Sequence, residues 1–412
     1  MVKFERFQLS NGLTVLVNED RTTPLVAINI LYPVGSRDEQ PDKTGFAHLF
    51  EHLMFGGSVN IPSYDNPVQM VGGETNAGTS NDTTNYYLIL PSDNIETGFW
   101  LESDRMLKLN FSEQSLRVQQ NVVIEEYNQR YLNQPYGDIW LLLRPLAYKV
   151  HPYRWPTIGE NIEHIRDAAL DDVESFFYSH YAPNNAFMAL SGNISVDKAF
   201  SLVQKWFGDI EKRKVKPGNI PQEPVQNEAR NLTVTRKVSY DALYKVWHIP
   251  GRLEKGYYVC DMITDLLSSG KSARLYQALV KEKKLFSKIN AYITGDIDPG
   301  LLVVGGKVMA GISLDEANKA VEDMLHNLID KPITDRELKK VQNKYEALLL
   351  MGQTSALNKA MDLSYFEMLG DANLLNQEIE KYCSITPADI TNTAHDIFHE
   401  TNCSSLFYMA EK

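Results

Sequence analysis

Apolar and polar residues alternate along the first part of the chain in a pattern that predicts a β-hairpin and a following strand. Asn11-Gly12 is a preferred tight turn between residues 7–9 and the alternating residues 13–17. The apolar residues 25–34 predict a third strand, and residues 74–90 predict a strand pair. Helical periodicity predicts helices over residues 44–57, 94–109, 113–131, 173–178 and 196–207, with an extended segment at 186–190. This mixture is typical of α+β domains.

The composition changes between residues 212 and 230, where the chain is poor in apolar residues. Lysines and arginines are followed there by Pro217, Gly218, Pro221 and Pro224, which is typical of a linker. We therefore predict a first domain at residues 1–215, a linker at 216–230 and a second domain at 231–412.

The second half repeats the layout of the first. Two predicted strands in the second half, residues 232–234 and 244–251, have the same order and pattern as residues 13–17 and 28–35 in the first half. A helix predicted at residues 256–267 follows them, as the helix at residues 44–57 follows the strands of the first half. The expected fold class is α+β, with two homologous α/β-sandwich-like domains that arose by internal duplication.

Composition narrows the class of protein. The chain has 412 residues, of which 43% are hydrophobic and 23% charged, as expected for a globular protein with full cores. The net charge of -12 argues against nucleic acid as a partner. Three cysteines without a CxxC pair indicate neither a disulfide scaffold nor a thiolate zinc site. No run of 18 apolar residues and no apolar leader occurs, so we expect a soluble protein, cytoplasmic or periplasmic, without a membrane span.

The segment His48-Leu49-Phe50-Glu51-His52 carries candidate metal chemistry. On a helix, His48 and His52 at i and i+4 share one face, and Glu51 lies beside them. Two imidazoles can then share one zinc ion while the carboxylate acts on water at the metal. The order HxxEH is the inverzincin signature. The alternative is two solvated or core histidines on an ordinary helix.

A catalytic zinc typically takes three protein ligands, so one more must come from elsewhere. The predicted helix around residues 121–127 is the best source, because Glu125 and Glu126 follow an apolar stretch there. A carboxylate on such a partly buried face needs a cation or hydrogen-bond donors to offset its desolvation. The alternative is a surface glutamate pair that forms salt bridges.

Further motifs accompany HxxEH in order along the first half. They are Tyr32-Pro33-Val34-Gly35-Ser36, Gly45-Phe46-Ala47 before His48, Asn76-Ala77, Thr83-Thr84-Asn85-Tyr86-Tyr87, Val122-Val123-Ile124-Glu125-Glu126, His151-Pro152-Tyr153 with Ile158-Gly159, and Tyr181-Ala182-Pro183-Asn184-Asn185-Ala186. On these residues the chain resembles the M16 metallopeptidases, the family of pitrilysin, insulin-degrading enzyme and the mitochondrial processing peptidase. The resemblance implies a metalloendopeptidase fold that is half of a clamshell.

The resemblance also implies a role for each matching residue. His48, His52 and Glu126 would bind one Zn²⁺ per chain, with Glu125 the less favoured third ligand, and Glu51 would be the general base. Peptide substrate would add as a strand along Asn76 and Ala77. The family usually has a glutamate seven residues before Glu126, where this chain has Gln119. That amide would keep a hydrogen bond beside the ligands but lose the charge.

Another departure concerns the second half. Family members complete catalysis with an Arg and a Tyr, seven residues apart, that stabilise the carbonyl oxyanion. The matching positions here are about Val280 and Ser287, and Arg274 has Lys281 seven residues on, so the pair is missing. The resemblance therefore favours the catalytic subunit of a heterodimer with a homologous subunit that supplies this pair, and a homodimer is less favoured. Non-catalytic scaffold and presequence-processing roles remain alternatives.

Overall fold

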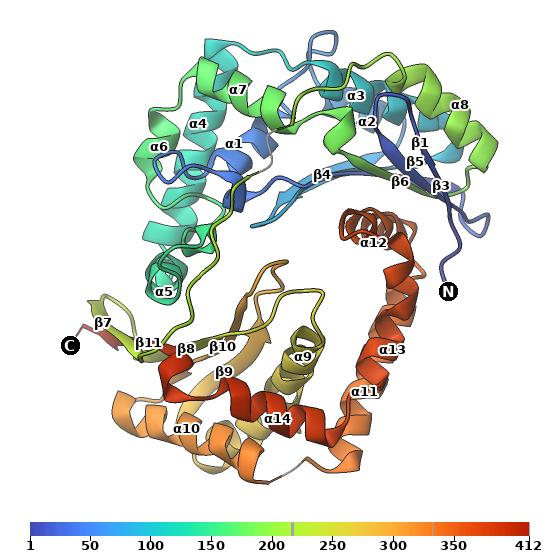
Figure 1. Cartoon of the computed structure of the whole chain (residues 1–412). Helices are drawn as coiled ribbons and strands as arrows, with labels where there is room; N and C mark the ends of the chain where they lie inside the picture. Colours follow the sequence, from blue (N-terminus) through green and yellow to red (C-terminus); the bar gives the residue numbers. More distant parts are fainter. Residues whose placement is uncertain (216–217, 332, 412) are drawn as a thin grey trace. The chain divides into compact units, whose positions relative to one another are not determined.

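The computed structural model describes residues 1–215, 218–331 and 333–411. The chain forms two compact units, each built from three segments (Figure 1). Unit 1 contains Met1–Arg130, Trp155–Pro221 and Leu350–Gln377, and unit 2 contains Tyr131–Arg154, Gln222–Leu349 and Glu378–Lys412. Each half of the chain therefore contributes one segment to the unit formed mainly by the other half. The predicted domain boundaries around residues 216–230 stay a prediction, and Lys216, Pro217 and Lys412 lie outside the described residues.

Unit 1 is built on a six-stranded sheet in the order β1-β2-β6-β3-β5-β4. Its strands are β1 (Glu5–Gln8), β2 (Thr14–Glu19), β3 (Leu25–Tyr32), β4 (Glu74–Thr79), β5 (Thr84–Pro91) and β6 (Phe187–Gly192). The predicted hairpin is confirmed, since β1 pairs antiparallel with β2 and Gly12 adopts a φ of +93° that favours glycine. Only the β2–β6 pair is parallel among the pairs of this sheet.

The helices of unit 1 cover both faces of this sheet. They are α1 (Phe46–Leu53), α2 (Asp65–Met70), α3 (Ile95–Leu107), α4 (Glu113–Tyr127), α6 (Ile162–Arg166), α7 (Leu170–His180), α8 (Val196–Phe207) and α12 (Ala356–Met368). Helix α12 packs on one face, where its Leu363 and Phe366 are buried against Leu16 and Ala27 (Figure 1). The Nδ2 of Asn29 on β3 also donates a 2.6 Å hydrogen bond to Ser364 Oγ.

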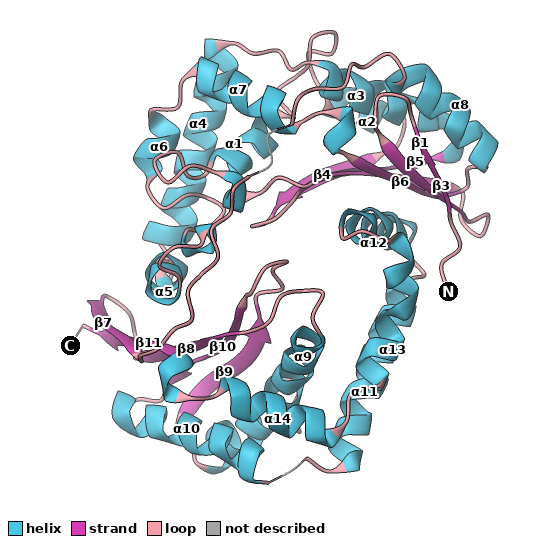
Figure 2. Ribbon diagram, in the orientation of Figure 1, coloured by secondary structure: helices cyan, strands magenta, loops and turns pink. Residues whose placement is uncertain are grey.

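Unit 2 repeats this design with a five-stranded sheet in the order β7-β11-β8-β10-β9 (Figure 2). Its strands are β7 (Arg230–Arg236), β8 (Ala242–His248), β9 (Phe286–Ile293), β10 (Leu301–Val308) and β11 (Cys403–Ala410). Its helices are α5 (Ile139–Ala147), α9 (Lys255–Ser268), α10 (Leu314–Asp330), α11 (Asp335–Gly352), α13 (Glu378–Cys383) and α14 (Pro387–Ile397). Helix α5, from the first half of the chain, buries Leu143 and Ala147 on one face of this sheet.

The two sheets share one topology. Strands β7, β8, β9, β10 and β11 take the places of β2, β3, β4, β5 and β6, and in both sheets only the first and last of these strands pair in parallel. Helix α9 follows β8 as α1 follows β3, and α5 takes the place of α12. The predicted fold class and duplication are confirmed. No helix formed by the described residues is long and apolar enough to cross a membrane.

Two predicted helices are shorter than their sequence patterns suggested. The helix expected at residues 44–57 is confined to Phe46–Leu53. The one expected at residues 113–131 is α-helical to Tyr127 and continues as a π-helical turn, Asn128–Leu132. Such turns break the α-helical hydrogen-bond register and are frequent near functional sites.

Candidate metal centre

Helix α1 carries the HxxEH segment, and two residues before it fix where it begins. Gly45 precedes the helix with φ +89°, and a Cβ there would lie 2.6 Å from the carbonyl oxygen of Ile158. The carboxylate of Glu39 is 7% exposed and accepts hydrogen bonds from the amides of Gly45 at 2.9 Å and Ala47 at 2.8 Å. Glu39 therefore satisfies two amides that a helix N-terminus leaves without partners.

The two faces of α1 have different environments. Leu49, Phe50 and Leu53 are buried, and the ring of Phe50 stacks on Tyr181 with a centroid separation of 5.0 Å. This packing anchors the helix to unit 1 and turns His48 and His52 toward α4.

Helix α4 supplies the carboxylate that faces these histidines. Ser112 caps its first turn by accepting a hydrogen bond from the amide of Ser115, and Val123 and Tyr127 are buried on its inner side. Glu126 lies toward α1, whereas Glu125 is exposed and accepts a 3.0 Å hydrogen bond from Gln129. Of the two glutamates considered from the sequence, the fold thus brings Glu126 to the histidines.

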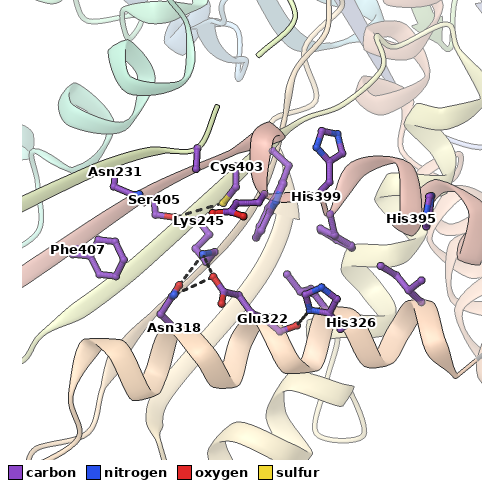
Figure 3. Close-up of a pocket in the computed structure, with 16 residues that line it drawn as sticks. Asn231, Lys245, Asn318, Glu322, His326, His395, His399, Cys403, Ser405 and Phe407 are labelled. Atoms are coloured by element: carbon purple, nitrogen blue, oxygen red, sulfur yellow. Dashed lines mark hydrogen bonds and ion pairs between the residues drawn. The ribbon is translucent and has the colours of Figure 1, made fainter. Parts of the chain in front are cut away.

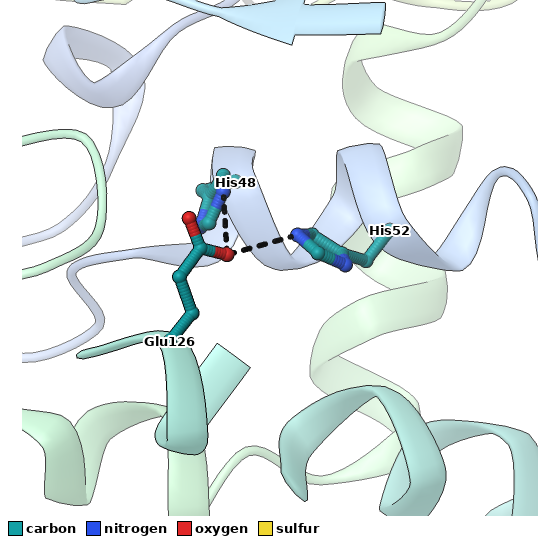
Figure 4. A group of neighbouring side chains, drawn as sticks. All are labelled: His48, His52 and Glu126. Atoms are coloured by element: carbon teal, nitrogen blue, oxygen red, sulfur yellow. Dashed lines mark ion pairs between the residues drawn. The ribbon is translucent and has the colours of Figure 1, made fainter. Parts of the chain in front are cut away.

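His48, His52 and Glu126 converge on one point (Figure 4). Oε2 of Glu126 lies 3.7 Å from Nε2 of His48 and 3.5 Å from Nε2 of His52, and the three donor atoms lie within 4.8 Å of one another. Tetrahedral zinc with these ligand types holds its donor atoms about 3.4 Å apart. The donor set and spacing therefore fit zinc. Within the described parts of the chain, no other group of three such residues is arranged to hold a metal ion.

The protonation state of His48 also suits a ligand. Burial, followed by the electrostatic influence of His52 and Arg130, lowers the pKa of His48 to about 3. Its imidazole is therefore neutral at physiological pH, as metal coordination requires. The buried Nδ1 of His48 has no hydrogen-bond partner among the described residues. The second oxygen of Glu126 forms a 2.9 Å ion pair with Arg130.

Glu51 lies between the two histidines in sequence and is held by strand β4. The hydroxyl of Thr79 donates a 2.6 Å hydrogen bond to Oε2 of Glu51. Burial raises the pKa of Glu51, while this hydrogen bond and His52 partly oppose the rise. A carboxylate with a raised pKa and a fixed orientation is suited to proton transfer.

The other predicted site residues take different positions. Asn76 and Ala77 lie on β4, which is the edge strand of the sheet of unit 1, and Asn76 is exposed. Gln119 lies toward the C-terminal end of α1, where a Cβ on Gly56 would be 4.0 Å from its Nε2. Among the described residues, no hydrogen bond or ion pair joins Gln119 to His48, His52 or Glu126.

Unit 2 uses the corresponding helix for packing. Asp261 of α9 accepts a 2.7 Å hydrogen bond from the hydroxyl of Tyr382, and Asp265 pairs with Lys344 at 2.7 Å. These contacts fasten α9 to α11 and α13.

Sequence reasoning missed two residues around α1. Thr79 could have been found, because strand alternation puts it on the same face of β4 as Ala77. Glu39 could not, because it lies six residues before Gly45, outside the spacing of a local capping motif.

The two α/β units share one topology, and the first carries the HxxEH helix and a distal glutamate. Together they define a duplicated fold with a His/His/Glu cluster that could hold a metal ion. Two family models match: residues 14–138 match insulinase (peptidase family M16), and residues 167–345 match the peptidase M16 inactive domain. The chain belongs to peptidase family M16.

Relatives that match this chain over nearly their whole length support this assignment. The zinc protease PqqE of Helicobacter pylori is 28% identical over 98% of this chain and 92% of its own length. The uncharacterized zinc protease YmxG of Bacillus subtilis is 25% identical over 98% of this chain and 97% of its own length.

Solved structures show the same fold. The crystal structure of a protease from Helicobacter pylori matches with a TM-score of 0.94 at 28% identity, covering 99% of this chain and 100% of that chain. A peptidase M16 inactive domain from Pseudomonas fluorescens matches at 0.88 and 18% identity, covering 100% and 98%. Pitrilysin matches at 0.77 and 16% identity over 99% of this chain but 45% of its own, so this chain has the length of half a pitrilysin.

Proposed function

We propose that this protein is a zinc-dependent endopeptidase in which His48, His52 and Glu126 bind one zinc ion. The observation that carries this proposal is the convergence of three donor atoms within 4.8 Å, next to the half-buried carboxylate of Glu51. Relatives named zinc proteases support the choice of metal.

Zinc held at this site supplies Lewis acidity toward the peptide carbonyl and toward water. Glu51 is the residue that moves the proton: it accepts one from the attacking water and delivers it to the leaving amine. The raised pKa of Glu51 helps it to retain the proton between the two transfers, and Thr79 keeps its carboxylate oriented. No covalent intermediate on the protein is needed.

Strand β4 gives the substrate a place to bind. A peptide chain that adds to this edge along Asn76 and Ala77 would form main-chain hydrogen bonds, which recognise extended backbone more than side chains. Because Thr79 of the same strand contacts Glu51, such a peptide would run toward the general base. The substrate class is peptides and unfolded segments of proteins.

We further propose that a homologous subunit completes the site. Val280 and Ser287, at the positions of the missing Arg/Tyr pair, cannot stabilise an oxyanion through a charged or phenolic group. Arg274 is held by Glu337, with Nε 3.0 Å from Oε1. A missing oxyanion donor typically costs on the order of a hundredfold in rate. A heterodimer whose other subunit carries the pair is therefore favoured over a homodimer.

The absence of the Arg/Tyr pair also keeps a second candidate, a non-catalytic scaffold subunit of the same fold. The retained ligand set and Glu51 favour the peptidase. Trimming of a presequence from a specific precursor would use the same chemistry, with a narrower choice of substrate.

The test combines metal content with turnover. The chain is purified alone and with a homologous subunit that has the Arg/Tyr pair, and cleavage of an unfolded protein is measured. We expect one zinc per chain, activity that requires the second subunit, and loss of activity with retention of zinc in Glu51→Gln. Glu126→Gln should lose zinc, and the matched control Glu125→Gln should keep it. Equal turnover in wild type and Glu51→Gln would refute the mechanism, and full activity of the isolated chain would refute the heterodimer.

A further inference from the structure

Unit 2 contains a cavity of about 830 Å³ between its sheet and helices α10 and α14 (Figure 3). Its apolar lining comes from β8, α10 and the segment after α14, and includes Trp247, Leu325, Ile329 and Phe398. Ile329 is only partly buried, so apolar surface remains exposed to solvent here. A cavity of this size has room for several side chains of a ligand.

One charged group of this cavity, the ammonium of Lys245, is already neutralised. The Nζ of Lys245 donates hydrogen bonds to Asn318 at 2.7 Å and to Glu322 at 2.9 Å, and its side chain is 5% exposed (Figure 3). The lysine therefore does not require an anionic ligand, and the site favours an occupant that is apolar on one side and polar on the other.

Unit 1 shows what covers the corresponding place. There α8 packs on α3 and β2, which are the counterparts of α10 and β7. Its Ala199, Leu202, Val203 and Phe207 are buried. The carbonyl oxygen of Phe207 also accepts a 2.7 Å hydrogen bond from Asn11 in the hairpin. In the described part of unit 2, no helix lies between α10 and β7.

The strands β2 and β7 differ in polarity on the face that borders this place, and the difference indicates what kind of helix could bind in unit 2. Leu16 faces α12, so Val15 and Val17 point to the α8 side of β2, where they are 0% and 1% exposed. On β7 the equivalent face carries Asn231 and Thr235, and both are exposed. A helix in unit 2 would therefore meet an apolar floor from β8 and α10 and a polar wall from β7, so it must be amphipathic.

We propose that this cavity is the docking site for an amphipathic helix of a partner protein, about three turns long and seated as α8 is in unit 1. The helix presents small, aliphatic and aromatic residues at i, i+3, i+4 and i+8, the spacing of the buried residues of α8. A second copy of this chain cannot supply α8, since that helix is part of the core of its own unit 1.

The probe is a fluorescein-labelled peptide of residues 195–208, titrated with metal-free full-length protein and followed by fluorescence anisotropy. Because a short free helix must be ordered on binding, we expect saturable binding in the micromolar range. Asn231→Trp, at an exposed position, fills the cavity and should weaken binding at least about tenfold. The matched control Thr235→Trp lies on the same strand face about 13 Å further along and should leave binding unchanged.

A peptide with Leu202→Asp and Val203→Asp should not bind. Absence of saturable binding up to about 1 mM would overturn the proposal, because the cavity would then be a solvent-filled groove. Binding unchanged by Asn231→Trp would overturn it as well, because the peptide would then bind elsewhere. Neither readout depends on zinc or on peptidase activity.

Discussion

Replacing Glu39 by alanine should loosen the start of helix α1, which carries the candidate metal ligands His48 and His52. The substitution leaves the buried amides of Gly45 and Ala47 without acceptors, and each unsatisfied amide costs about 1–3 kcal/mol. Removal of a buried carboxylate offsets part of this cost, so we expect local destabilisation of about 2–4 kcal/mol. Glu39→Gln keeps one acceptor oxygen and should lose about half as much.

Hydrogen exchange of peptides that cover α1 measures this effect directly. A loss of 2 kcal/mol in opening free energy corresponds to roughly thirtyfold faster exchange. His48 lies in the first turn of this helix, so zinc affinity should fall as well. Asp42→Ala, at an exposed position in the same loop, is the matched control and should change neither quantity. Unchanged exchange in α1 of Glu39→Ala would refute the assigned capping role.

Three other perturbations have defined outcomes. Thr79→Val removes the hydrogen bond that lowers the pKa of Glu51. We therefore expect kcat to fall about tenfold and the acidic limb of the pH–rate profile to move to higher pH. An acidic limb at the same pH as in wild type would contradict this role of Thr79. Hydrogen bonds from Arg274 lower the pKa of Glu337 to about 2, so this carboxylate stabilises the fold above its unfolded pKa of about 4.3. The difference in the free energy of unfolding between wild type and Glu337→Gln, measured with urea, should shrink as the pH falls from about 4 toward 2. A difference that does not change with pH would show that the ion pair is not its cause. Removal of metal by a chelator should lower the Tm, since zinc at a hundred times its Kd adds about 2.7 kcal/mol.

Much of the fold follows from local patterns. The Asn11-Gly12 hairpin, the strand at β3 and helix α8 were predicted because each has its own periodicity or turn signal. The place of α12 could not be predicted, since an apolar helix face does not say which sheet it covers. Helix α5 contains Pro145, and a proline inside a segment argues against a helix there. The packing of Leu143 and Ala147 on the unit 2 sheet outweighs this local preference.

In the candidate site, too, residues placed by local helix geometry could be predicted from the sequence, and residues placed by tertiary packing could not. The i, i+4 spacing of His48 and His52 follows from helix geometry, so their proximity could be predicted from the sequence. Glu126 and Glu125 were equally placed by composition, and only the packing of Val123 and Tyr127 turns Glu126 toward the histidines. Thr79, which orients Glu51 from β4, had only the alternation of its strand as a sequence signal, and Glu39 had none.

The helix exchange between the two halves has a consequence for synthesis. The face of the unit 1 sheet that α12 covers remains exposed until residues 356–368 have left the ribosome, about 10–35 seconds after β6 at ordinary translation rates. A chain interrupted before that point has the HxxEH segment but lacks the helix that completes the core around Leu16 and Ala27. Premature products should therefore be recognised as unfolded and degraded before the candidate metal site is stable, so that only chains made almost to the end persist.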